Sequence, residues 1–262
     1  MNLTGETSQS PPLERVLKSD RFITIGSLVF VCLVSWFYIL SGAGVGMGEM
    51  VSVKSSWTPA YFALMLTMWW VMMVAMMLPS AAPTILLFAA VNRKSHQQGR
   101  PYTQTGFFAA GYLAVWGGFS FVAVVAQWGL VHLTLLSTMM QTTSPYLGAG
   151  LLIAAGAYQL TPLKQACLRH CRSPIEFIAH HWRQGTVGAF RMGLEHGLFC
   201  LGCCWVLMAL LYYGGVMNLW WIAGLAFYVL IEKLSPLGPR FGRFTGSFLI
   251  IWGVGVLLEA AG

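Results

Sequence analysis

The sequence is poor in charge. Only 9% of its 262 residues are charged and only 8 are Asp or Glu, whereas 57% are hydrophobic and the mean hydropathy is +0.68. A soluble domain of this length needs a polar surface, which so few charged residues do not supply, so most of the outer surface is expected to face lipid. Because backbone groups in hydrocarbon must pair within their own segment, long apolar runs in such a chain are expected to be helices. The composition therefore predicts an all-α integral membrane protein.

Motifs of several enzyme classes are also missing. The sequence has neither a glycine-rich phosphate-binding loop nor the nucleophile elbow of hydrolases. A carboxylate-based ion or proton pump is poorly supported, because Glu195 is the only carboxylate near the interior of an apolar run. The net charge of +7 does not indicate a nucleic-acid partner, since the basic residues lie in short loops rather than on a polar domain.

Seven apolar runs are candidates for membrane-spanning helices. The second run contains Pro79 and Pro83, which predict a tilted or kinked helix. The polar and basic stretch 161–191 separates the fourth and fifth runs and suggests an interfacial helix at 174–182. The chain is thus predicted to be a polytopic bundle of about seven spans, with a tail at 1–21 and a single transmembrane domain at 22–262. The runs cover about residues 22–40, 59–91, 105–136, 145–160, 192–213, 217–231 and 244–258.

Basic residues are concentrated on one side of these runs. Of the 15 Lys and Arg residues, all but Lys54 fall in the N-terminal tail or in the loops after runs two, four and six. The positive-inside rule makes that side cytoplasmic, with the N-terminus inside and the Cys/His loop at about 161–191 on the same side. Glu232 and Lys233, at the end of the sixth run, are interpreted as an interfacial anchor. The lipid bilayer is the first predicted partner.

The fifth run carries the strongest chemical signal. On a helix, His196, Cys200, Cys203, Cys204 and Met192 all fall within roughly 80° of His196. Thiol, imidazole and thioether groups are soft or borderline donors that suit Cu(I) or Zn(II) rather than Mg or Ca. Ligands one turn apart cover only one side of an ion, so other elements would have to complete its coordination. The alternative is packing, because Cys behaves as a small hydrophobe in cores.

Two further groups of soft donors are candidate ligands. In the cytoplasmic loop, Cys167, His170 and Cys171 would lie together on one side of a helix, or they are simply exposed, reduced residues. In the second run, Met72 and Met76 form an i,i+4 pair, and so do Met73 and Met77. Thioethers select Cu(I), although Met is also an adaptable packing residue.

Three stretches resemble a known family. Its members are bacterial integral membrane proteins described as predicted metal-binding proteins of unknown function. The resemblance extends from about residue 59 to the C-terminus and implies membrane location and metal binding, but no activity. With the cytoplasmic loops, it indicates a bacterial inner (cytoplasmic) membrane. The stretches that carry it are MMVAMMLP (72–79), YQLTPLK (158–164) and HGLFCLGCCW (196–205).

Three functions follow from these residues. The leading hypothesis is membrane handling of a soft transition metal, copper before zinc, by binding, delivery or transport, with a metallochaperone or metalloenzyme client as partner. The second is a membrane thiol/disulfide oxidoreductase that uses the C-x₂-C pair Cys200 and Cys203. The third is a non-catalytic subunit or assembly factor of a membrane complex, held by packing of small residues.

Overall fold

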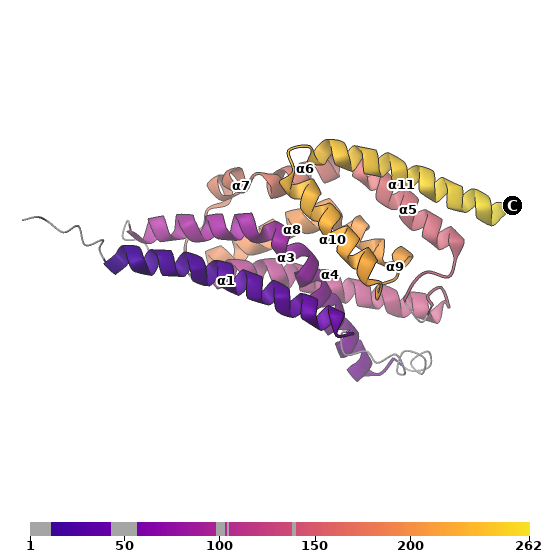
Figure 1. The fold of residues 1–262 in the computed structure, drawn as a ribbon, viewed down its shortest axis with the longest axis horizontal. Helices are drawn as coiled ribbons and strands as arrows, with labels where there is room; N and C mark the ends of the chain where they lie inside the picture. Colours follow the sequence, from indigo (N-terminus) through magenta and orange to yellow (C-terminus); the bar gives the residue numbers. More distant parts are fainter. Residues whose placement is uncertain (1–11, 43–56, 98–102, 104, 138–139) are drawn as a thin grey trace, which may run out of the picture.

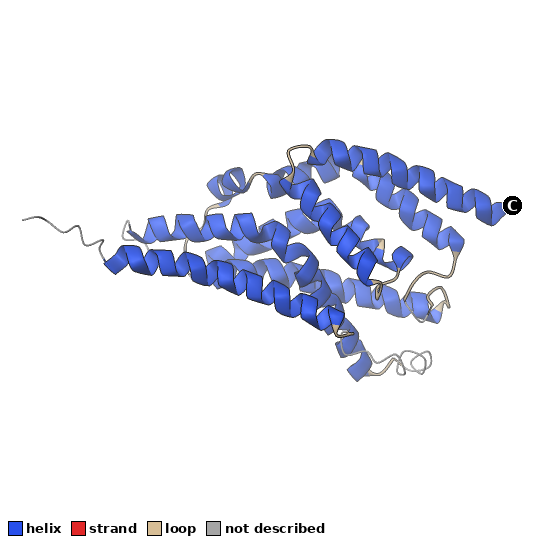
Figure 2. Cartoon of the chain, in the orientation of Figure 1, coloured by secondary structure: helices blue, strands red, loops and turns tan. Residues whose placement is uncertain are grey.

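A computed structural model describes residues 12–42, 57–97, 103, 105–137 and 140–262. The predicted tail before residue 12, Lys54 and Arg100 lie outside the described residues. The described part consists of helices and loops, with one isolated β-bridge between Leu136 and Thr142 and no strand (Figure 2). The all-α prediction is confirmed.

Five helices of the described part are long and apolar enough to cross a membrane. They are α1 (Pro12–Leu40) through its segment Phe22–Leu40, α3 (Pro59–Gln97), α4 (Thr105–His132), α8 (Gly185–Ala209) with the adjoining α9 (Leu211–Gly214), and α11 (Gly238–Ala261). The fourth and sixth predicted runs are also helical, as α5 (Pro145–Gln159) and α10 (Leu219–Leu234). At 15 and 16 residues they are shorter than the roughly 20 that a span needs, so five of the seven predicted spans reach the required length.

Capping residues decide where the shorter helices begin. Ser144 and Thr161 each accept a hydrogen bond from a backbone N–H of the first turn, at 3.3 Å, and a proline follows each of them. Asn218 caps α10 in the same way, through the Trp221 N–H at 3.3 Å. These bonds satisfy N–H groups that have no partner within the helix.

The polar stretch between the fourth and fifth runs folds into two helices, α6 (Pro162–Arg172) and α7 (Pro174–His181). The predicted helix at 174–182 is confirmed as α7, and α6 precedes it. Lys164, Leu168 and Cys171 are the buried residues of α6, at i, i+4 and i+7, so this short helix turns one face into the protein.

Pro79 and Pro83 lie inside the continuous helix α3. Figure 1 shows that α3 changes direction along its length, as the two prolines predict. The Met77 carbonyl, just before Pro79, accepts hydrogen bonds from the Ser80 hydroxyl at 2.8 Å and from the Tyr112 hydroxyl at 3.1 Å. Side chains thereby support the backbone next to the bend.

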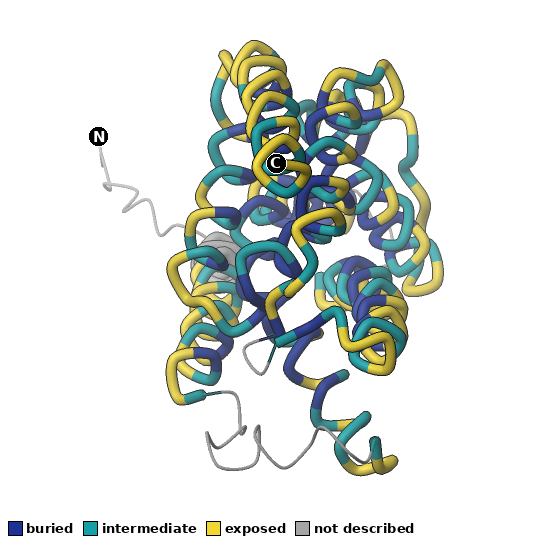
Figure 3. Tube along the Cα trace, turned by 90° about the vertical axis from the view of Figure 1, so that its right-hand side faces the viewer, coloured by how far each residue is buried: buried dark blue, intermediate teal, exposed yellow. Residues whose placement is uncertain are grey.

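The interior of the bundle is built around α3 and α8. These two are the most buried of the long helices, and α1 and α11 are the least buried. In Figure 3 the buried positions lie inside the bundle and the exposed ones on its outer faces. Helix α1 packs along α3 and α11 along α5 (Figure 1). Large apolar side chains of the two outer helices, such as Phe37 and Ile251, remain exposed.

Two glycines let α4 and α8 approach to backbone contact. A Cβ at Gly111 would lie 2.1 Å from the Phe190 carbonyl oxygen, and one at Gly193 would lie 2.0 Å from the Phe108 carbonyl oxygen. No real Cβ is tolerated at such distances, so only glycine permits this packing. The contact brings Tyr112 of α4 against the cysteine-bearing part of α8, at 3.0 Å from Cys200 Sγ.

Replacing Gly111 by Ala should therefore separate the two helices. We expect Gly111→Ala to lower the free energy of unfolding by about 1–3 kcal/mol through overpacking. Gly118 of the same helix is exposed, and a Cβ there meets nothing within 4 Å. Gly118→Ala should change the free energy by less than about 1 kcal/mol. Thermal unfolding of the detergent-purified variants measures both, and equal melting temperatures would contradict the packing argument.

Candidate functional site

Four cysteines from two helices meet in the interior. Cys200, Cys203 and Cys204 lie on α8 and Cys171 lies near the end of α6, and all four are buried. The Cys203 and Cys204 thiols both donate to the Cys200 carbonyl oxygen, at 3.0 Å. The Cys171 side chain lies beside those of Cys200 and Cys203 and interacts with both. We call these four residues the cysteine cluster.

Cys171 is held as a neutral thiol. Its interactions with Cys200 and Cys203, followed by burial, raise the pKa of the Cys171 thiol well above its usual range. It can therefore act as a hydrogen-bond donor to neighbouring sulfur, and a metal that bound it would have to displace the thiol proton.

A buried ammonium group faces the cluster. Lys233 Nζ, from α10, lies 2.9 Å from Cys200 Sγ and 3.2 Å from Ser80 Oγ, and the side chain is only 4% exposed. Tyr112 Oη contacts the same sulfur from α4, at 3.0 Å. Cys200 Sγ is thus met by polar groups from two other helices. The interpretation of Glu232 and Lys233 as an interfacial anchor is wrong, because both side chains are buried.

Glu232, the residue before Lys233, is held in place by a buried ion pair with Lys164. Lys164 Nζ donates to Glu232 Oε1 at 2.6 Å, and the two side chains are 0% and 1% exposed. Lys164 also donates to Gln159 Oε1, whose amide nitrogen donates to the Tyr228 hydroxyl at 2.6 Å. This network joins α5, α6 and α10, and so sets the position from which Lys233 reaches Cys200.

His196 lies one turn before Cys200 and is buried, as predicted for the stripe on α8. Aromatic rings surround it: its centroid is 5.1 Å from that of Phe177, 5.8 Å from Tyr112 and 6.1 Å from Phe108. Its Nδ1 atom has no hydrogen-bond partner. A buried polar atom without a partner costs roughly 1–3 kcal/mol, so this nitrogen is a site at which a ligand would be stabilising.

The predicted methionines occupy different places. Met72 and Met76 are buried in the hydrophobic core, and Met192 Sδ accepts a hydrogen bond from the Arg183 backbone N–H at 3.3 Å. Met77 instead reaches the cysteine cluster, with Sδ 3.9 Å from Cys204 Sγ. Of the two predicted methionine pairs, the one with Met77 therefore contacts the cluster.

The predicted group Cys167, His170 and Cys171 is divided by the fold. Only Cys171 joins the cluster. Cys167 is half-buried with its Sγ against Gly202, and burial, followed by the nearby Cys203, raises the pKa of its thiol. The His170 ring stacks on Phe199, with centroids 4.1 Å apart.

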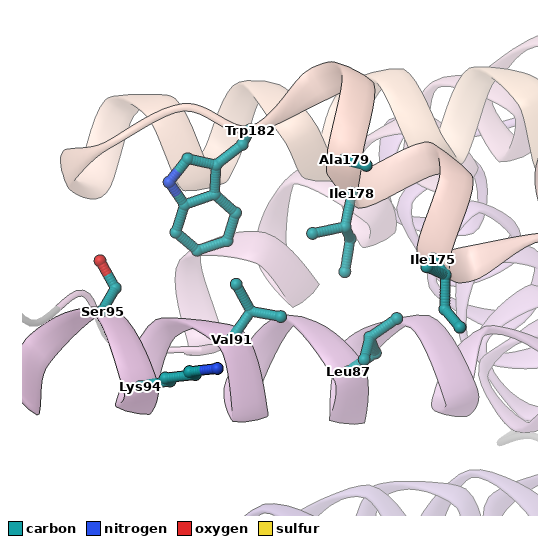
Figure 4. Close-up of a pocket in the computed structure, with 8 residues that line it drawn as sticks. All are labelled: Leu87, Val91, Lys94, Ser95, Ile175, Ile178, Ala179 and Trp182. Carbon is teal, nitrogen blue, oxygen red and sulfur yellow. The ribbon is translucent and has the colours of Figure 1, made fainter.

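A pocket of about 370 Å³ lies between α3 and α7, away from the cluster (Figure 4). Lys94 and Ser95 are polar residues of its wall, Trp182 closes one end, and apolar side chains line the rest. Figure 4 shows the residues of α3 on one side and those of α7 with Trp182 on the other. Because no cysteine lines this pocket, it is separate from the candidate site.

The cluster supplies soft donors but no ready-made coordination shell. Within the described ranges, no group of three or more His, Cys, Asp and Glu side chains is arranged so that it could hold a metal ion. The thiols contact one another and Lys233. Thiolate and thioether sulfur are ligands for Cu(I), and a thiol must lose its proton to bind. A soft cation that bound these thiols would have to displace their protons.

Sequence reasoning missed three of the groups around the cluster. Lys233 carried a signal, because an ionisable residue at the end of an apolar run is a site candidate by default. Tyr112 and Ser80 reach the cluster through packing between helices that are distant in sequence. No local pattern distinguishes them from other residues of their helices.

A comparison with protein-family models matches residues 66–256 to a family described as PpoB2, copper chaperone. The matched range contains the cysteine cluster, Met77 and Lys233. No curated protein and no solved structure matches the chain.

The buried ion pair beside the cluster should be far more important for stability than the exposed one. We expect Lys164→Met, which strands the Glu232 carboxylate, to cost about 3–5 kcal/mol. Arg183→Met breaks the more exposed pair with Glu195, which is 2.7 Å long, and should cost less than about 1 kcal/mol. Adding Glu232→Leu to Lys164→Met should recover most of the loss. Chemical unfolding in detergent measures these differences, and equal losses for the two Lys/Arg variants would refute the assignment.

Proposed function

The chain belongs to the PpoB2 family of copper chaperones, and we propose that it binds Cu(I) at the cysteine cluster, within a membrane, for delivery to a client protein. One observation carries the proposal: Cys171 of α6 meets Cys200 and Cys203 of α8. The stripe on α8 alone covers one side of an ion. The thiol of Cys171 meets these two sulfurs from a second helix, and so covers a side of the ion that α8 leaves open.

The charge of the site favours a monovalent ion. Two thiolates and one Cu(I) leave a single negative charge, which the Lys233 ammonium beside Cys200 neutralises. With Zn(II), the same two thiolates and Lys233 would leave a positive charge. An uncompensated charge in a buried site is strongly unfavourable. Soft sulfur ligands also prefer Cu(I) on grounds of chemistry.

Each residue of the site has a proposed role. Cys200 and Cys203 hold the ion as the two thiolates, which are soft ligands suited to Cu(I), and Cys171 contacts both of them from α6 as a neutral thiol. Cys204 with the nearby Met77 thioether, 3.9 Å away, offers an adjacent pair of soft donors onto which the ion could shift. The Tyr112 hydroxyl positions Cys200 Sγ through their 3.0 Å contact.

We place the chain in a bacterial cytoplasmic membrane, with the long helices across it and the basic loops in the cytoplasm. The exposed apolar side chains of α1 and α11 support this placement, since such surface is stable against lipid. Helices α6 and α7 next to the cluster then lie on the cytoplasmic side, in the compartment where copper and thiols stay reduced. A metal-accepting protein is the expected client.

Copper binding should depend on the cluster and not on cysteine content. We expect the purified protein, loaded with Cu(I) under reducing conditions, to retain it in near-stoichiometric amount by mass spectrometry. Cys200→Ser and Cys203→Ser should each weaken Cu(I) binding by about 10–100-fold in competition with a Cu(I) chelator. Cys32→Ser, in α1, should bind as the wild type does. A wild-type protein that takes up no copper would end the proposal.

The role of Lys233 predicts a change in metal preference. Lys233→Met removes the compensating charge, so the affinity for Cu(I) relative to Zn(II) should fall by about tenfold, or about 1.4 kcal/mol. Lys94→Met makes the same substitution at an exposed position of α3 and should leave the ratio unchanged. Competition titrations of both metals on each variant give the ratio. Because both affinities are measured on one protein, a general loss of stability does not mimic the effect, and an unchanged ratio in Lys233→Met would exclude charge selection.

A further inference from the structure

Two histidines lie together outside the cysteine cluster. His170 of α6 and His181 of α7 have ring centroids 6.4 Å apart, with the ring planes at 77°. Both side chains are half-buried, so they are accessible from the surface. A metal–imidazole bond is about 2.0 Å, so two rings that share an ion between them have centroids separated by about 6 Å. The observed separation fits one shared ion.

Hydrogen bonds fix both rings in a tautomer suited to metal binding. His170 Nδ1 lies 3.0 Å from the Ala166 carbonyl oxygen, and His181 Nδ1 lies 3.0 Å from the Phe177 carbonyl oxygen. A carbonyl oxygen only accepts, so each Nδ1 carries a proton and donates it. In the neutral ring the lone pair is then on Nε2, the arrangement found in histidines that ligate metals.

Two phenylalanines connect this pair with the buried site. The His170 ring stacks on Phe199, the residue before Cys200, at 4.1 Å. The His181 ring stacks on Phe177 at 4.7 Å, and the Phe177 ring lies 5.1 Å from that of His196. Phe177 therefore lies between an accessible histidine and a buried one.

His196 provides the independent indication of a ligand. Its side chain is 2% exposed, and its Nδ1 atom has no hydrogen-bond partner. It lies on the same stripe of α8 as Cys200, one turn away. A donor nitrogen left unsatisfied between the histidine pair and the cluster is explained if an ion occupies it transiently.

We propose that His170 and His181 form an outer Cu(I) site, which captures the ion and passes it by way of His196 to the cysteine cluster. The inference rests on the copper-binding function proposed above. Copper remains monovalent throughout, and each transfer replaces one donor by another. Neutral imidazoles leave the charge of the ion uncompensated, whereas thiolates offset it, so the ion moves from the weaker site to the stronger. The thiol protons displaced at the cluster are released to solvent.

The outer site should control how fast copper is loaded rather than how tightly it is held. In the full-length protein in detergent, we expect His170→Ala combined with His181→Ala to slow transfer from a Cu(I)–chelator complex to the cluster by about tenfold. The equilibrium affinity of the cluster should stay within about twofold of the wild type. His180→Ala is the matched control: His180 is an exposed histidine of the same helix whose Nδ1 also contacts a backbone carbonyl, at 2.9 Å. If the double alanine variant unfolds, the double variant His170→Gln, His181→Gln is measured in its place.

A second measurement separates this inference from the function on which it rests. In a Cys200→Ser, Cys203→Ser background, X-ray absorption should show Cu(I) bound through nitrogen, and the two histidine substitutions should abolish that signal. The outer site would be refuted if the double histidine variant loaded copper at the wild-type rate and the cysteine variant bound no copper through nitrogen. The proposed function of the cluster would then still stand. If the cysteine variant bound copper through nitrogen but the wild type bound none through sulfur, the outer site would be supported and the proposed function rejected.

Discussion

The Lys233 ammonium lies inside a bundle that contains very little charge, and the surrounding structure provides partners for it. An unpaired ion in such an interior is strongly destabilising. Lys164, the other buried lysine of the described chain, is neutralised by Glu232, while Lys233 is directed at Cys200 Sγ and Ser80 Oγ. Glu232 therefore neutralises Lys164 and leaves Lys233 without a carboxylate partner. The Lys233 ammonium lies beside Cys200 Sγ, where its charge would offset that of thiolates or of thiolates with bound copper.

Contacts between helices bring the partners of Cys200 and Lys233 together. Glycines at the α4–α8 contact bring Tyr112 to Cys200, and the ion pair between α6 and α10 places Lys233 at the same sulfur. Helix α6 turns Cys171 inward with Lys164, because both belong to its buried face. The same face thus supplies a thiol to the cluster and a cation to the network that supports it. A substitution that moved α6 would therefore disturb both the cluster and the ion pair.

The candidate ligands differ in how accessible they are. The His170 and His181 side chains are half-buried on α6 and α7, whereas His196, the cysteine cluster and Met77 are buried. Donors that bind more weakly are thus the more accessible ones, an order that suits capture followed by retention. The rings of Phe199 and Phe177 stack on the two half-buried histidines.

The sequence by itself determined the helical class, the apolar segments and the stripe of His196, Cys200 and Cys203 on one face of α8, because helical period and hydrophobicity are local properties. It also predicted the helix at 174–182 and the bend at Pro79. It did not distinguish Cys171 from Cys167, Met77 from Met76, or a buried Lys233 from an interfacial anchor. Those outcomes depend on which faces meet in the folded bundle. Contacts between helices distant in sequence are set by close packing and charge pairing, and so only the tertiary structure decided them.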